Sequence, residues 1–343
     1  MSDFEKLINR FKDKIKNALN SLELDKLRSE IFGKNGLINT EFKKLGSLSA
    51  DDKKKIASEI NNAKQELTKK SRNFWSGSIC FVGLLAVFSY SVGIGLIPLS
   101  LTQIATGLGT AILIIVALYF AYLITLGGHN TEEKKRLLVI LWLFLLSAIF
   151  WSGFEQAGSS LNLFAQNLTD RNVFGWLMPA GFLQSVNSAF IIIFSPIFAS
   201  LWLWLASRKA NPSIPVKFGL GLLGLSAGFF VIAWGAVNAS ISPVSPAWLV
   251  VMYFFFTVGE LALSPVGLSS ITKLAPAGRV GQMMGIWFVA TALGNLFAGL
   301  VAGNLETLEP FELFRSVAMT TGAFGLLALA VSRAVDKMSG NIN

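Results

Sequence analysis

Eight long apolar blocks decide what this chain can fold into. They cover about residues 75–98, 102–126, 137–164, 174–206, 217–238, 247–272, 280–303 and 312–335. A helix needs roughly 20 apolar residues to cross a bilayer, and every block is long enough. The whole chain is 53% hydrophobic and only 14% charged, well away from globular averages. The sequence therefore predicts an all-α, polytopic membrane helix bundle with about eight transmembrane helices.

The charge divides the chain into unlike parts. Residues 1–73 carry 17 Lys and Arg against 11 Asp and Glu, which leaves 12 against 9 for the longer remainder. We expect a soluble basic segment at 1–72, a two-helix transmembrane hairpin at 75–126, a six-helix bundle at 137–335 and a tail at 336–343. The lone Cys80 excludes an intrachain disulfide, and the lone His129 follows two glycines as a solvated loop residue would. No metal site is predicted.

The connecting loops predict the orientation, because Lys and Arg accumulate on the cytoplasmic side. Basic residues precede the first block and follow the second, fourth, sixth and eighth. They are Lys69, Lys70, Arg72, Lys134, Lys135, Arg136, Arg208, Lys209, Lys217, Lys273, Arg279, Arg333 and Lys337. The intervening loops contain one basic residue, Arg171. We therefore predict a multi-pass protein of the cell's inner (plasma) membrane with both termini in the cytoplasm.

Glu260 is the first candidate for a functional residue. It lies near the middle of the block 247–272, which holds no other charged residue. A carboxylate at that depth costs at least about 2.5 kcal/mol to insert, so it is retained mainly for proton, ion or substrate work. Ser264 follows one helical turn later, just before the helix breaker Pro265.

Further polar side chains interrupt the neighbouring blocks. Gln184 and Asn187 are one turn apart on one face, Glu155 lies in the third block, and Trp287 lies in the seventh. With Glu260 and Ser264 they suggest a wet cavity suited to a zwitterionic solute, in which Glu260 binds an ammonium group. Other roles stay open. The two amides also suit hydrogen bonds between helices, worth ~0.6 kcal/mol each, Trp287 suits ordinary packing, and Glu155 is near enough to its block's end to reach the interface.

The same segments resemble the proton-dependent oligopeptide transporter (POT/PTR) family of the major facilitator superfamily. FEQAGSSLNLFA, QSVN, GELALSPVGLSSITKLAP and GQMMGIWF look like that family's seventh, eighth, tenth and eleventh helices, and the resemblance covers about residues 78–335. It implies a transporter of di-, tri- and oligopeptides, not an enzyme, with protons as coupling ion and no cofactor. It also implies that Glu260 binds the peptide amino terminus, that Asn187 and Gln184 line the pocket with Ser264 and Trp287 beside them, and that Glu155 and Glu260 couple protons.

The resemblance is to one half of the family's fold. Family members carry an acidic and arginine motif on their first helix and a lysine on their fourth, and nothing in this sequence matches either. Alternating access needs two bundles that rock around a midplane site. We therefore expect the C-terminal half of a major facilitator fold, inactive alone, whose partner is a missing N-terminal half of six helices.

Residues 22–67 resemble a different family, the N-terminal arm of the phenylalanyl-tRNA synthetase alpha subunit. That arm is an antiparallel helical hairpin that contacts tRNA, and residues 49–67 carry a capping box, Ser49 with Asp52, and an apolar seam. No synthetase catalytic core follows, so we expect weak tRNA contact without aminoacylation. The chain thus has the form of a fusion. The alternatives to transport are a membrane-tethered tRNA-binding arm or a non-functional chimeric, structural membrane protein.

Overall fold

A single long helix, α4 (Ala50–Gly93), joins the basic segment to the first apolar block. The structure, a computed structural model, describes residues 13–15, 27–31, 50–303 and 308–340. It divides into two units, 1–99 and 100–343. Ser49 of the capping box and half of the predicted hairpin lie outside the described residues, although Leu67 of the seam is buried. The helix passes without a break through residues 69–75, and the predicted domain boundaries stay a prediction.

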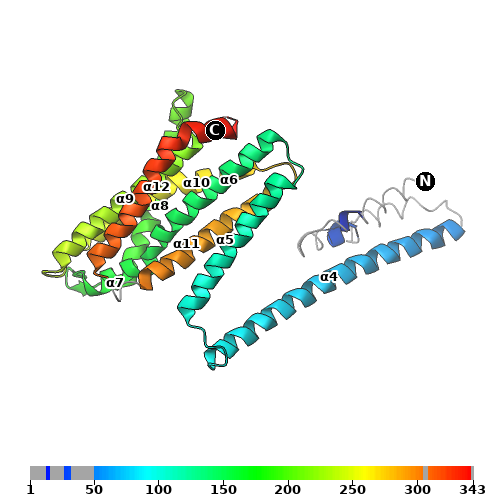
Figure 1. The fold of residues 1–343 in the computed structure, drawn as a ribbon, viewed down its shortest axis with the longest axis horizontal. Coiled ribbons are helices and arrows are strands. Elements are labelled where there is room, and N and C mark those ends of the chain that lie inside the picture. The colour runs from blue at the N-terminus through cyan, green and yellow to red at the C-terminus, as the bar shows by residue number, and fades with distance from the viewer. Residues whose placement is uncertain (1–12, 16–26, 32–49, 304–307, 341–343) are drawn as a thin grey trace. The chain divides into compact units, whose positions relative to one another are not determined.

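The second unit is a helical bundle (Figure 1). Its long helices are α5 (Leu101–Thr125), α6 (Thr131–Phe154), α8 (Ser185–Ser207), α9 (Ile214–Ala239), α10 (Ala247–Leu274), α11 (Val280–Gly303) and α12 (Pro310–Ser339). Helix α9 packs along both α12 and α10. Helix α6 packs along α11, and α5 also contacts α11. Eight helices of the described chain are long and apolar enough to cross a membrane, which confirms a multi-pass, all-α membrane protein.

Glycines let α9 and α10 approach backbone to backbone. A side chain at Gly224 would come within 3.1 Å of the Cα of Gly259, and one at Gly259 within 2.6 Å of the carbonyl oxygen of Gly221. Lipid offers no hydrophobic drive between helices, so such close approach supplies the packing energy. The spacing of Gly224 and Gly228 predicts this close packing. Gly299 has the same spacing pattern with Gly303, yet within the described residues an added side chain at either position meets no neighbour within 4 Å.

Two predicted blocks are not continuous helices. The third, 137–164, is broken where α6 ends at Phe154, and continues as a 3-10 turn η2 (Glu155–Gly158) and α7 (Ser160–Asn167). The fourth, 174–206, begins as a hairpin of β1 (Asn172–Val173) and β2 (Trp176–Leu177) and a turn η3 (Ala180–Gln184). Its membrane helix α8 starts only at Ser185. Phe174 and Gly175 have positive φ angles of 52° and 83°, which a helix cannot contain.

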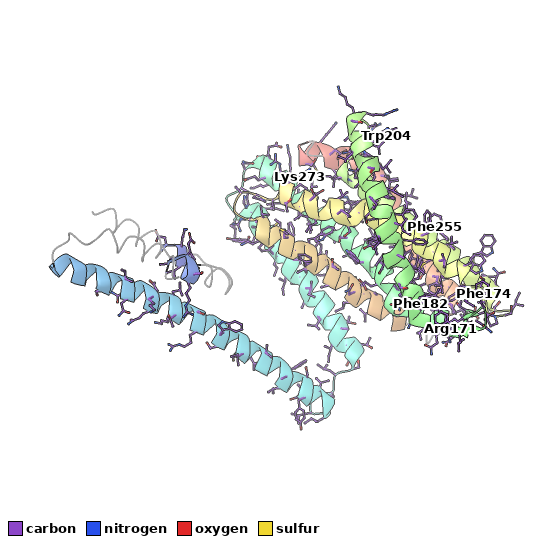
Figure 2. The ribbon with its side chains drawn as sticks, turned by 180° about the vertical axis from the view of Figure 1, so that it is seen from behind. Arg171, Phe174, Phe182, Trp204, Phe255 and Lys273 are labelled. Carbon is purple, nitrogen blue, oxygen red and sulfur yellow. The ribbon has the colours of Figure 1, made fainter. Side chains whose placement is uncertain are left out.

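The connections alternate between the two ends of this bundle. Figure 2 shows Arg171, Phe174 and Phe182 near one end, and Trp204 and Lys273 toward the other. Trp204 lies near the C-terminal end of α8 and Lys273 near that of α10, whereas Arg171 precedes α8. The basic residues after the fourth and sixth blocks are therefore grouped at one end. Which side of a membrane that end faces stays a prediction.

Candidate functional site

Glu260 and Asn187 meet between α10 and α8. The Nδ2 of Asn187 donates a hydrogen bond of 3.3 Å to Oε2 of Glu260 and one of 3.0 Å to the hydroxyl of Thr257. Thr257 lies one turn before Glu260 and donates its own proton to the backbone carbonyl of Tyr253 at 2.8 Å. The carboxylate is thus held in a small polar cluster that joins two helices.

Thr257 is the member of this cluster that the sequence did not reveal. It is fully buried. A threonine in an apolar helix usually bonds the carbonyl four residues back, so its presence alone indicates nothing. Because that bond uses its proton, the hydroxyl oxygen can only accept from Asn187. Thr257 therefore fixes the direction of the Asn187 amide and, through it, of Glu260.

Gln184 and Ser264 flank this cluster along the chain. Gln184 ends η3, three residues before Asn187, so the two amides stay one turn apart although Gln184 is not in α8 itself. Ser264 follows Glu260 by four residues on α10, and the two therefore share a face. Both side chains are half-buried. Their role in binding a substrate stays a prediction.

Trp287 lies inside the bundle and is only 4% exposed. Its indole covers Gly267 so closely that even a methyl group there would collide with it. It also makes an edge contact with Phe218 of α9, with ring centroids 6.1 Å apart. This is the packing role that the sequence left open. Its predicted place beside a substrate is not tested by this arrangement.

Glu155 is the first residue of η2, where α6 ends. With its amide nitrogen turned toward the acceptors, Asn295 of α11 donates to Oε1 of Glu155 at 3.3 Å and to the carbonyl of Thr291 at 3.2 Å. Asn295 was not among the predicted site residues. The signal was present, since an asparagine within a block of apolar residues needs a partner in lipid.

Gln156, next to Glu155, has a structural role. It is fully buried, and its Nε2 donates to the carbonyl of Ala298 at 3.1 Å and to that of Ser152 at 3.3 Å. Its Oε1 accepts a hydrogen bond of 2.6 Å from Ser160. The bond to Ser152 satisfies a carbonyl near the end of α6, where the helix breaks, and the bond to Ala298 links the break to α11. They hold η2, and with it Glu155, against α11.

The two glutamates can serve one site. Their carboxylates are close enough to interact electrostatically, and neither forms an ion pair within the described residues. Such a pair can hold a proton or attract an ammonium group, and each carboxylate already has an amide partner that fixes its direction. Among the described residues, no cluster of three His, Cys, Asp or Glu could hold a metal ion.

Comparison with known families gives two matches. Residues 81–311 match the model of the POT family (PTR2). Residues 20–73 match the class II aminoacyl-tRNA synthetase N-terminal domain. The second match covers the segment that resembles the synthetase arm, which is not a catalytic domain.

Individual relatives are transporters. The peptide transporter YePEPT of Yersinia enterocolitica is 41% identical over 235 residues, covering 68% of this chain and 46% of that protein. The di-/tripeptide transporter of Lactococcus lactis subsp. cremoris is 28% identical over 235 residues, 67% of this chain and 47% of that protein. A crystal structure of a peptide transporter POT in complex with sulfate superposes with a TM-score of 0.69 at 29% identity, covering 82% of this chain and 62% of that one. The chain spans about half the length of the curated relatives it matches.

Proposed function

Because the chain belongs to the POT family, we propose that it forms one of the two helical bundles of a proton-coupled transporter of di- and oligopeptides. It transports only together with a complementary bundle. It lies in the cell's inner membrane with both termini in the cytoplasm, as the grouping of basic residues at one end of the bundle favours. Named relatives are peptide transporters and not enzymes.

The observation that carries this proposal is the Glu260 cluster. A carboxylate held by Asn187 from a second helix is preorganised to pair with the amino terminus of a peptide. Asn187 adds a carbonyl oxygen that accepts no hydrogen bond within the described residues, so it suits a second ammonium proton. Gln184 and Ser264 extend the polar surface on either side.

Proton coupling is assigned to Glu155 and Glu260 together. Two carboxylates that interact cannot both ionise as readily as either alone. Arrival of a peptide ammonium at Glu260 would favour the ionised form there and change the proton affinity of Glu155. Asn295 supports this by holding the Glu155 carboxylate in place.

A complementary bundle is needed because the site is open on one side. Helix α8 supplies Asn187, yet none of its residues is fully buried in this chain. A carboxylate site enclosed from one side only cannot alternate between the two faces of a membrane. The second bundle would supply both the missing wall and the cationic partners.

Uptake measurements test the proposal. Cells that express this chain alone are expected to show no proton-driven dipeptide uptake, and co-expression with the N-terminal six helices of a POT relative is expected to produce it. An impermeant thiol reagent, in a Cys80→Ser background, should label a cysteine at Ser242 from outside and not one at Lys209, which controls for insertion and orientation. Uptake by the chain alone, in an unassociated monomer, would contradict the need for a second bundle.

A second candidate function, tRNA contact, concerns the arm at residues 1–72. The match to a synthetase N-terminal domain favours it. In the described part of the arm, one cleft of α4 is lined by Lys64, Lys69 and Arg72 together with Asn61, Gln65 and Thr68. Such a set suits phosphate groups, and all three basic side chains are exposed. We expect binding without aminoacylation.

The salt dependence of tRNA binding distinguishes a tRNA-binding role of these basic residues from a helix face that is only exposed to solvent. If lysine and phosphate pairing carries it, the affinity of the full chain for tRNA should fall about tenfold or more between 50 and 200 mM salt, as counterion release requires. The triple change of Lys64, Lys69 and Arg72 to Gln should flatten that dependence. A salt-independent affinity, or no binding at low salt, would remove this function.

A further inference from the structure

A cavity of about 420 Å³ lies between α8, α9 and α10, apart from the Glu260 cluster. Along α10 its walls include Leu261, Pro265 and Ser269, which repeat every four residues and so share a face. Glu260 and Ser264 precede this series by one position, which turns them about 100° round the helix. The cavity therefore opens on a different side of α10 from the candidate peptide site.

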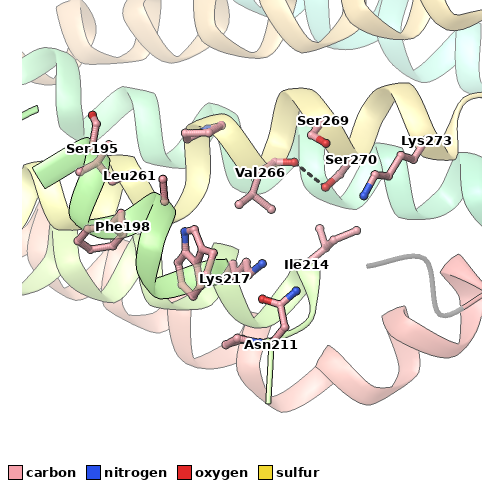
Figure 3. Close-up of a pocket in the computed structure, with 14 residues that line it drawn as sticks. Ser195, Phe198, Asn211, Ile214, Lys217, Leu261, Val266, Ser269, Ser270 and Lys273 are labelled. Carbon is pink, nitrogen blue, oxygen red and sulfur yellow. Dashed lines mark hydrogen bonds between the residues drawn. The ribbon is translucent and has the colours of Figure 1, made fainter. Parts of the chain in front are cut away.

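A buried lysine reaches into this cavity. Lys217, in the first turn of α9, is only 8% exposed, and its ammonium group makes no hydrogen bond or ion pair within the described residues. Its Nζ lies 4.6 Å from the ring centroid of Trp202. Figure 3 shows its amine end directed into the cavity near Asn211. The aromatic ring offsets only part of the cost of burying an ammonium group.

A second cation faces the same space. Lys273, at the end of α10, also lines the cavity (Figure 3), and its ammonium group is near enough to that of Lys217 for the two to repel. None of the fourteen described residues that line the cavity is acidic. The buried ammonium group of Lys217 has no ion pair within the described residues, and no carboxylate lines the cavity, so the local field there favours an anion. The N-terminal end of α9 adds the positive end of a helix dipole.

The rest of the lining indicates what kind of anion fits. Asn211 has a buried Oδ1 without a hydrogen-bond partner in the described chain, so it can accept a proton from a ligand hydroxyl. Away from the two lysines, Phe198, Leu261 and Val266 make part of the wall apolar, and Ser195, Ser269 and Ser270 add hydroxyl groups (Figure 3). A polar cationic end that continues into an apolar channel is complementary to an amphiphile whose head is anionic.

We propose that this cavity binds a phosphate group between Lys217 and Lys273. The apolar walls favour an anionic phospholipid as its source, with the acyl chain along α8 and α10, over free phosphate. A phosphate accepts charge-assisted hydrogen bonds from both ammonium groups, and these are about twice as strong as neutral ones. Occupancy would join the ends of three helices without touching the Glu260 cluster.

Native mass spectrometry of the full detergent-solubilised chain tests this with three probes: dioleoylphosphatidylglycerol, dioleoylphosphatidylcholine and inorganic phosphate. The unaltered chain should retain phosphatidylglycerol in preference to phosphatidylcholine. Lys217→Gln should weaken that retention about tenfold, because it removes one charge-assisted hydrogen bond to the phosphate. Lys217→Arg keeps such a bond and should therefore keep most of the retention. Lys337→Gln, which removes an exposed charge in the last turn of α12, is the matched control and should change nothing.

Competition between the probes distinguishes a phospholipid from free phosphate as the source of the phosphate group. Displacement of phosphatidylglycerol by millimolar inorganic phosphate, or a Lys217-dependent phosphate adduct alone, identifies free phosphate as a ligand, whereas retention despite phosphate identifies the lipid. If Lys217→Gln does not fold, as circular dichroism would show, Ser269→Asp introduces a carboxylate on the exposed rim of the cavity and should expel the anion instead. The proposal is overturned if neither probe binds in a way that Lys217→Gln or Ser269→Asp weakens.

Discussion

Replacing Glu260 by glutamine is expected to abolish proton-driven dipeptide uptake in the complemented transporter while leaving the bundle folded. Glutamine keeps the shape of the side chain and can still accept a hydrogen bond from Asn187, which now donates at 3.3 Å. It cannot pair with the ammonium of a peptide or carry a proton. Loss of one partner from a buried charge pair costs about 3–5 kcal/mol, so uptake should fall at least ~100-fold.

Ser264→Ala is the matched control for Glu260→Gln. It removes one neutral hydroxyl from the same face of α10, worth about 1 kcal/mol, and should lower uptake only about fivefold. The amount of each variant in the membrane should equal that of the parent chain. Normal uptake by Glu260→Gln at equal expression would show that the peptide ammonium binds elsewhere.

Gly259→Ala is expected to destabilise the whole bundle, although alanine is the better helix former by about 1 kcal/mol. The new methyl group would lie 2.6 Å from the carbonyl oxygen of Gly221 and 3.2 Å from the amide nitrogen of Leu225. Both are backbone atoms, so α9 and α10 must separate to admit it. Overpacking of this kind costs about 1–3 kcal/mol, enough to lower the melting temperature of the solubilised chain by several degrees.

The chain contains its own control for this change. Gly299 lies in α11, and an added methyl group there would meet no described residue within 4 Å, so Gly299→Ala should leave the melting temperature unchanged or raise it. Fluorescence-detected size exclusion after heating would compare the two variants. If Gly259→Ala melts at or above the parent temperature, the two helices are not in backbone contact. Gly259 also adjoins Glu260, so the destabilised variant should lose peptide uptake as well.

Hydropathy predicted the number and positions of the membrane helices but not their continuity. An apolar block shows only that a segment is hydrophobic enough to lie in lipid. The segments around Glu155 and before Ser185 are that hydrophobic, although they are not regular helix. Just after the break at Phe154, Gln156 donates a hydrogen bond to Ala298, a residue 142 positions away. Local sequence cannot show such a partner.

The candidate site was predicted in part for a related reason. Glu260 stands out because a carboxylate in an apolar block is costly, whatever surrounds it. Thr257 became visible only when the helices were placed side by side, because it acts through Asn187 on another helix. Asn295 is an amide within an apolar block, a signal that the sequence did carry, but its partner Glu155 became visible only in the structure. Trp287 has a distinctive sequence context, and its indole fills space over Gly267 in the core, while its place beside a substrate stays a prediction.

The unbroken course of α4 sets a rotational register between the arm and the first membrane helix. Over its 44 residues the helix advances about 1.5 Å and turns about 100° per residue. Because no loop absorbs a change in length, one residue inserted between Arg72 and Trp75 would swing the cleft at Lys64 and Lys69 round to another side of the helix. The basic arm and the first membrane helix are therefore joined by one rigid helix. The direction in which the basic cleft points depends on how many residues lie between the cleft and the membrane segment.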